Sequence, residues 1–155
     1  MTGVGPLLRK FWTITRKLPA GQWLFSRFLG LYVPYTGSIR ACILELRPGY
    51  CKVRLKDKRR VRNHLNSVHA IALCNLGEMA TGLALLNALP GDARGILRNI
   101  QVNYLHKAHG TLIAECQCDC VTDNQKQEIA LTGNIYNADK KLVTQVNAIW
   151  LIGPL

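Results

Sequence analysis

The longest helical pattern in the chain runs from Val68 to Leu89, and it constrains the fold more than any other feature. Ser67 is the expected N-cap, and Pro90-Gly91 ends the helix. Its apolar positions recur at helical spacing along one side: Val68, Ala72, Leu76, Met79, Leu83 and Leu86. Ala, Gly and Thr occupy much of the remaining circumference. We therefore predict a core helix closely wrapped by the backbone of a sheet.

Strand patterns flank this helix on both sides. Two precede it and four follow it, each with apolar and polar residues in alternation. The expected strands are Ser38–Leu46, Tyr50–Lys58, Ile96–Lys107, Thr111–Cys120, Glu128–Tyr136 and Leu142–Ile152. The first 35 or so residues read as amphipathic, aromatic helices interrupted by Pro19 and Pro34. The sequence thus predicts an α+β fold: a bent antiparallel sheet of about six strands around a long central helix. Residues 1–36 form an N-terminal helical segment and 37–155 the main part of a single domain.

The chain is strongly basic, with 20 Lys and Arg against 9 Asp and Glu, a formal charge of +11. Such a field favours anionic partners. Lys52, Arg54, Lys56 and Lys58 recur at every second residue, which indicates one solvated face of a strand. We expect no nucleic-acid partner, because no helix-turn-helix, zinc-finger or stacking-aromatic strand motif is present.

No apolar run approaches the ~18 residues of a membrane span. The basic, aromatic N-terminal segment leaves two readings open. It packs on the domain or a partner subunit, or it makes a peripheral membrane contact.

Six cysteines are present, and their spacing does not indicate a metal site, since no C-x2-C pair occurs. Cys116, Cys118 and Cys120 alternate along an expected strand and share one face. We expect reduced thiols that behave as small hydrophobic side chains, and no metal. The N-terminus lacks the pattern of a signal peptide, so a cytoplasmic protein is expected.

Glu78 is the residue of the central helix that most needs explaining. It lies off the apolar stripe, about 200° around the helix from Leu76. It shares a second face with Ile71, Asn75, Gly82 and Leu85. A carboxylate on a core helix costs free energy unless it is paired or functional, so Glu78 is the first candidate for chemistry.

The order Asn63, His69, Glu78 resembles that of the hotdog-fold acyl-CoA thioesterases, and most narrowly the phenylacetic-acid-pathway and 4-hydroxybenzoyl-CoA thioesterase branch. In that family an Asn precedes His-Gly-Gly, and an Asp or Glu follows on the central helix. The resemblance extends from about Ile39 to the C-terminus and includes the segment IQVNYLHKAHG. It implies the hotdog fold and hydrolysis of an acyl-CoA thioester to free CoA and a carboxylic acid.

Carried over by position, the resemblance makes Glu78 the nucleophile or general base and the Ala70 amide the oxyanion donor. Asn63 and His69 then support the loop and the thioester. Coenzyme A is expected as part of the substrate, and no other cofactor is expected. Its phosphates need basic side chains near the site, and the candidates are Arg60, Arg62, Arg98 and Lys107.

One departure leaves a second function open. Ala70 and Ile71 stand where the family has two glycines, and their side chains narrow the approach to the helix N-terminus. The alternative is a non-catalytic acyl-CoA binding or regulatory hotdog protein.

The helix geometry itself predicts an oligomer. His69 and Glu78 are about 13–14 Å apart along the helix axis and roughly 180° apart around it. They cannot act on one carbonyl within a single chain, so we expect a homodimer, or a dimer of dimers, with a shared site.

Overall fold

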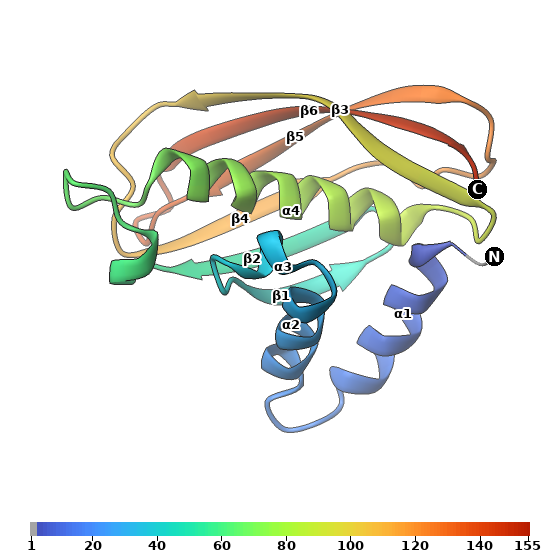
Figure 1. Ribbon diagram of the computed structural model, residues 1–155, viewed down its shortest axis with the longest axis horizontal. Coiled ribbons are helices and arrows are strands. Elements are labelled where there is room, and N and C mark those ends of the chain that lie inside the picture. The colour runs from blue at the N-terminus through green and yellow to red at the C-terminus, as the bar shows by residue number, and fades with distance from the viewer. Residues whose placement is uncertain (1–2) are drawn as a thin grey trace.

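The computed structural model describes residues 3–155 and begins with three helices (Figure 1). They are α1 (Val4–Thr15), α2 (Gly21–Tyr32) and the short α3 (Pro34–Gly37). This confirms the helical prediction for the N-terminal segment. The inner faces of α1 and α2 are buried through Leu8, Trp12, Phe25 and Leu29. The Arg9 guanidinium donates to the carbonyls of Asn87 and Leu89, which lie at the end of the central helix. The N-terminal segment is therefore docked on the protein.

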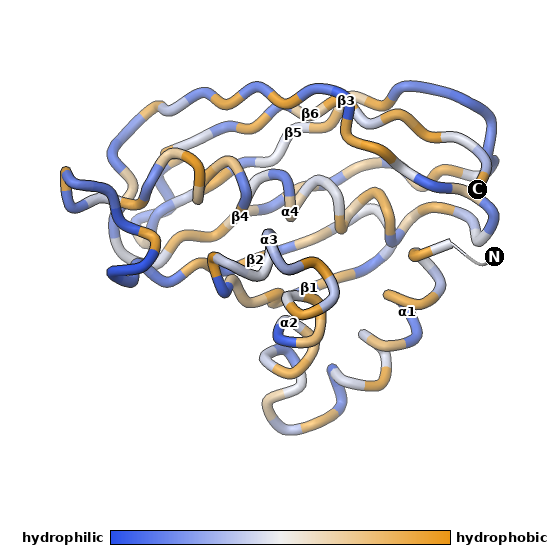
Figure 2. Tube along the Cα trace, viewed as in Figure 1, coloured by the Kyte–Doolittle hydropathy of each residue, from blue (hydrophilic) through white to orange (hydrophobic). Residues whose placement is uncertain are grey.

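Figure 2 shows hydrophobic positions, in orange, along the N-terminal helices. Several large apolar side chains there are exposed: Leu7, Ile14, Trp23, Phe28, Leu31, Tyr32 and Tyr35.

Six antiparallel strands form one sheet in the order β1-β2-β4-β5-β6-β3. Their bounds are β1 Cys42–Arg47, β2 Tyr50–Lys56, β3 Ala93–Tyr104, β4 Thr111–Gln117, β5 Gln127–Tyr136 and β6 Leu142–Pro154. A 3-10 turn, η1 (Arg59–Val61), follows β2. The α+β prediction is confirmed, with all six expected strands present.

The central helix, α4 (Ala70–Ala88), packs against all six strands. Its small residues allow the close approach that the sequence predicted. A Cβ added at Gly77 would lie 2.3 Å from Cγ2 of Val146 on β6, and one at Gly82 would lie 2.9 Å from the Trp150 ring. No larger side chain fits at these two positions without movement of the sheet.

By length and composition α4 would be long and apolar enough to cross a membrane. However, 72% of its apolar 18-residue stretch is buried inside the protein. Burial against the sheet accounts for its apolar character, as is typical of the core helix of a folded domain.

The two edges of the sheet differ. At the β1 edge, two side chains of α2 form hydrogen bonds with the backbone of the strand. Ser26 Oγ accepts from the Ile43 amide at 2.8 Å, and Gln22 Nε2 donates to the Leu44 carbonyl at 2.8 Å. At the other edge, β3 pairs with β6 on one side, and Ile96 and Tyr104 of this strand are each 49% exposed.

Several element boundaries differ from the prediction. The helix begins at Ala70, and its N-cap is His69, so the assignment of Ser67 was wrong. Ser67 instead closes a turn with Asn63. Strand β1 begins at Cys42 because Arg40 turns the chain with a left-handed backbone (φ 51°).

The strands β2 and β4 end earlier than expected, at Lys56 and Gln117. Lys58 therefore lies outside the basic strand face, which retains Lys52, Arg54 and Lys56. Cys118 and Cys120 lie beyond β4, so the prediction of three cysteines on one strand was wrong.

Candidate active site

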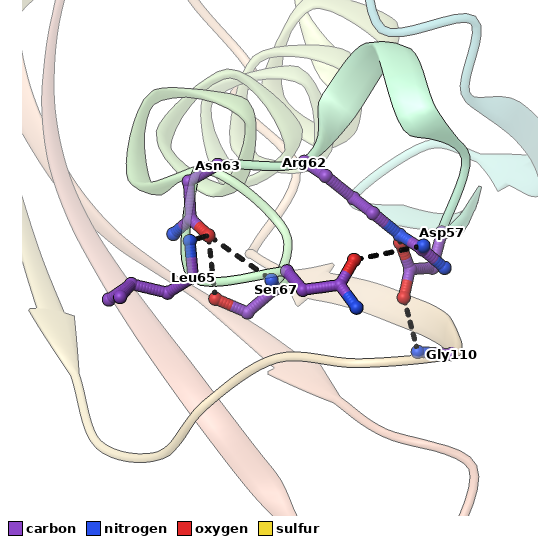
Figure 3. A network of polar contacts seen from close by, with 7 residues as sticks. Asp57, Arg62, Asn63, Leu65, Ser67 and Gly110 are labelled. Carbon is purple, nitrogen blue, oxygen red and sulfur yellow. Dashed lines mark hydrogen bonds and ion pairs between the residues drawn. The ribbon is translucent and has the colours of Figure 1, made fainter.

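A tight turn built on Asn63 precedes the central helix (Figure 3). The side-chain oxygen of Asn63 accepts hydrogen bonds from the Leu65 amide at 3.0 Å, and from the amide and hydroxyl of Ser67 at 3.1 and 3.2 Å. Its own amide donates to the Ser67 carbonyl at 2.8 Å. Asn63 thus shapes the loop.

His69 caps the helix that follows this turn. Its Nδ1 accepts from the Ile71 amide at 3.1 Å, and its own amide donates to Val61 at 2.7 Å. One of the free amides at the helix start is therefore already satisfied by the imidazole. The Ala70 amide has no hydrogen-bond partner within residues 3–155. It keeps the capacity of an oxyanion donor, and the helix dipole favours negative charge there.

A pocket of about 310 Å³ opens beside Ala70 and also includes Asn63, Tyr104 and Lys107. The Tyr104 hydroxyl donates to the Ala70 carbonyl at 3.0 Å and ties β3 to the first turn of α4. Sequence reasoning missed Tyr104, because its contact joins positions 34 residues apart. Ile71, one of the two residues in place of glycine, is 54% exposed.

Glu78 lies farther along α4, in a different pocket. It lines an apolar groove of about 190 Å³ between α4 and the N-terminal helices, with Leu8, Leu29, Met79 and Trp150 among the walls. Burial raises the pKa of the Glu78 carboxyl above its ordinary value. The carboxylate makes no ion pair within residues 3–155. A carboxylate with a raised pKa is a better proton acceptor than an ordinary one.

The structure does not bring Glu78 and the helix N-terminus together within one chain. Ala70 and Glu78 are eight residues apart on α4, about 12 Å along the axis. They line two different pockets. The separation that the sequence predicted is therefore present in the fold.

The four basic candidates are scattered. Arg62 is held by Asp57 at 2.6 Å and by Asn66, and Asp57 in turn accepts from the Gly110 amide (Figure 3). Arg98 pairs with Glu128 across the sheet at 2.6 Å. Lys107 lies beside Ala70. Arg60 lies in a different pocket, which it shares with two arginines that sequence reasoning missed, Arg27 and Arg40.

The six cysteines are free thiols. Burial raises the pKa of Cys116 to about 12 and that of Cys118 to about 11, so both are protonated at neutral pH. Within residues 3–155, no cluster of three or more His, Cys, Asp or Glu side chains is arranged to hold a metal ion.

This strand order, folded around a single long helix, defines the hotdog class, and solved structures share it. One, the structural-genomics protein APC5556, is 30% identical with a TM-score of 0.83, covering 96% of this chain and 99% of that one. A probable thioesterase from Pseudomonas aeruginosa is 18% identical, with a TM-score of 0.77 and coverage of 89% and 97%. A thioesterase family protein from Silicibacter pomeroyi is 17% identical, with a TM-score of 0.70 and coverage of 84% and 96%.

The fold is therefore the hotdog fold, as predicted. Within it, the profile of the domain of unknown function DUF4442 matches residues 21–152, and the chain belongs to this family. No curated protein sequence matches the chain. The narrower likeness to the phenylacetic-acid and 4-hydroxybenzoyl-CoA branch stays a prediction.

Proposed function

We propose that the protein is a thioester hydrolase that cleaves acyl-CoA at a site shared by two subunits. The observation that carries the proposal is Glu78, a half-buried carboxylate with a raised pKa on the core helix of a hotdog fold. It faces an apolar groove suited to an acyl group. The thioesterases among the structural relatives support the same chemistry.

The reaction needs one water and one thioester. Glu78 takes a proton from the water, whose oxygen attacks the thioester carbonyl. The negative charge on the carbonyl oxygen is held by the Ala70 amide and the helix dipole. Collapse of the tetrahedral intermediate breaks the C–S bond, and the departing thiolate receives the proton. The products are a carboxylic acid and free CoA. Direct attack by the Glu78 carboxylate, followed by hydrolysis of the anhydride, gives the same products.

A two-fold axis beside β3 supplies the second half of the site. The exposed side chains and free edge of this strand favour antiparallel pairing with β3 of a second copy. Such pairing sets two α4 helices side by side and antiparallel on one continuous sheet. Glu78 of one subunit then approaches Ala70 of the other, which the single chain cannot achieve. A dimer of dimers contains the same unit twice.

Substitution of Glu78 tests the proposal. Glu78→Gln should lower turnover of the best acyl-CoA by about 100-fold or more, since general-base contributions have that size. Affinity should change far less, because the amide keeps the shape of the carboxylate. The measurement is release of free thiol from short, aryl and long acyl-CoAs. The matched control is Glu45→Gln, which changes an exposed surface carboxylate paired with Arg47. Full activity in Glu78→Gln would refute the catalytic assignment.

One observation favours the alternative of acyl-CoA binding without turnover. The exposed Ile71 side chain stands at the start of α4, where a glycine would leave the helix N-terminus open. If Ile71 blocks the thioester, the wild type binds acyl-CoA without releasing thiol, and Ile71→Gly gains hydrolysis. If the wild type already turns over, this alternative fails.

A further inference from the structure

Three arginines from separate parts of the chain converge on one pocket. Arg27 comes from α2, Arg40 from the turn before β1, and Arg60 from η1. The pocket has a volume of about 400 Å³, and the Trp23 side chain forms part of its wall. No Asp or Glu is among its lining residues. Three positive charges thus face one cavity with no built-in negative charge.

The electrostatics of this cluster are unfavourable without a ligand. Burial lowers the pKa of Arg60, and the charges of Arg40 and Arg27 lower it further. A guanidinium stays charged all the same, so the mutual repulsion persists at neutral pH. The ion pairs within residues 3–155 involve Arg47, Lys52, Arg62 and Arg98, and none of the pocket arginines. An anion bound between them would relieve the repulsion.

The backbone also holds one of the three arginines in an uncommon conformation. Arg40 adopts a left-handed φ of 51°, and its amide donates to the Gly37 carbonyl at 3.0 Å. A non-glycine residue in this region is strained, and such residues concentrate at functional sites. Its flanking residues, Ile39 and Ala41, are buried and fix the turn.

This arginine pocket adjoins the groove that holds Glu78. Thr36 and Met79 line both cavities, and Met79 directly follows Glu78 on α4. A ligand with an acyl arm in the groove would therefore have its other end near the arginines. Guanidinium groups bind phosphate oxygens in pairs of hydrogen bonds, and an exposed indole stacks on a nucleobase.

We propose that Arg27, Arg40 and Arg60 form a phosphate-binding pocket that holds the phosphate-bearing end of an acyl-carrying ligand. The phosphate belongs either to the nucleotide of coenzyme A or to a lipid headgroup. The inference rests on the proposed function for the position of the acyl arm, and on the arginine cluster alone for the phosphate. These three arginines take the place of Arg62 and Arg98 as candidates for binding the phosphates, because the guanidinium groups of Arg62 and Arg98 are already paired with carboxylates.

Trp23 provides a direct measurement of binding. It is 60% exposed and lines the pocket, whereas Trp12 and Trp150 are buried. Intrinsic fluorescence of the full chain is followed during titration with CoA, with pyrophosphate, and with vesicles containing phosphatidylglycerol. Trp23→Phe should remove the fluorescence response. CoA and pyrophosphate binding without a response to vesicles assigns the nucleotide, and vesicle binding without CoA binding assigns the headgroup.

Arg27→Gln and Arg60→Gln should each weaken binding of the responding probe about tenfold or more, because each removes charge-assisted hydrogen bonds. The matched control is Arg59→Gln, which removes the same charge from a neighbouring exposed residue outside the pocket. Thermal unfolding of each variant confirms that the fold is kept. If Arg59→Gln weakens binding equally, or if the two pocket variants leave it unchanged, the inference is wrong.

The same variants separate this inference from the proposed function. If probe binding depends on Arg27 and Arg60 but the protein hydrolyses no thioester, the phosphate pocket is supported and the proposed enzyme activity is wrong. If the protein hydrolyses acyl-CoA and neither Arg60→Gln nor Arg27→Gln changes the KM, the proposed enzyme activity is supported and the phosphate pocket is wrong.

Discussion

Glu78 affects stability as well as chemistry. Its pKa is raised by burial in the folded protein, so the folded state binds more protons than the unfolded state between the ordinary carboxyl pKa and the raised value. The free energy of unfolding therefore falls as the pH rises through this window. At neutral pH the buried charge destabilises the fold. We expect Glu78→Gln to be more stable than the wild type at pH 7.

The gain should disappear in acid, where Glu78 is protonated in both states. Urea unfolding of wild type and Glu78→Gln at pH 7 and near pH 3.5 measures this difference. Glu45→Gln, a change at an exposed carboxylate, should show no such dependence. Equal stability of the Glu78 pair at pH 7 would mean that the carboxylate is solvated in the folded protein.

For individual residues, the sequence predicted some roles better than others. Glu78 was identifiable because a carboxylate departs from the pattern of an apolar helix, whereas Asn63 was singled out only through the resemblance to the thioesterase family. The capping role of His69 was missed because serine is the more common N-cap residue. In the structure the Ser67 hydroxyl instead donates a hydrogen bond to the side chain of Asn63. Arg27 and Arg40 were missed because their meeting with Arg60 depends on how α2 docks, which no local spacing records.

Among the elements, α4 is the least tolerant of added volume. Gly77→Ala places a methyl group against both methyls of Val146. The overpacking costs about 1–3 kcal/mol, against about 1 kcal/mol that Ala gains over Gly in a helix. We expect a net loss of up to about 2 kcal/mol in the free energy of unfolding. Gly153→Ala on β6 is the control, since a Cβ there meets nothing within 4 Å. Chemical denaturation measures both variants, and a stabilised Gly77→Ala would mean that the sheet yields.

The contact between α2 and β1 depends on one hydroxyl. Ser26 Oγ accepts from the buried Ile43 amide and donates to the Gln22 carbonyl at 2.6 Å. Ser26→Ala leaves that amide unpaired, which costs about 1–3 kcal/mol. Ser38→Ala, at an exposed serine, should change stability little. Amide hydrogen exchange at Ile43 should accelerate in the first variant alone. Unchanged exchange would show that the hydroxyl does not hold the edge.

Every strand and the core helix were identifiable from the sequence, because alternation and helical spacing report directly on burial. The boundaries shifted where a long-range contact decides them. Strand β1 starts late because Arg40 turns the chain toward α3, and β4 ends early although Cys118 still donates its amide to the Gly49 carbonyl at 2.8 Å. Such contacts leave no trace in residue periodicity.

For the whole molecule, the proposed shared site predicts that two defective subunits can repair each other. One variant lacks Glu78 (Glu78→Gln), and the other has a blocked helix start (Ala70→Trp). Each should be inactive alone. A hybrid dimer contains one composite site with both halves intact, so mixing after unfolding and refolding should restore up to about half the activity per hybrid. Thiol release measures it, with hybrid formation verified by differential tagging. Verified hybrids without activity would exclude the shared geometry.

The covered β1 edge limits how far such pairing can extend. Strand addition needs unpaired backbone groups, and α2 occupies those of β1 through Gln22 and Ser26. Pairing through β3 alone joins two chains into one sheet whose two outer margins are both covered by helices. In the proposed dimer the N-terminal helices would thus act as terminators: they would make the assembly finite and prevent open-ended growth of a β-ribbon.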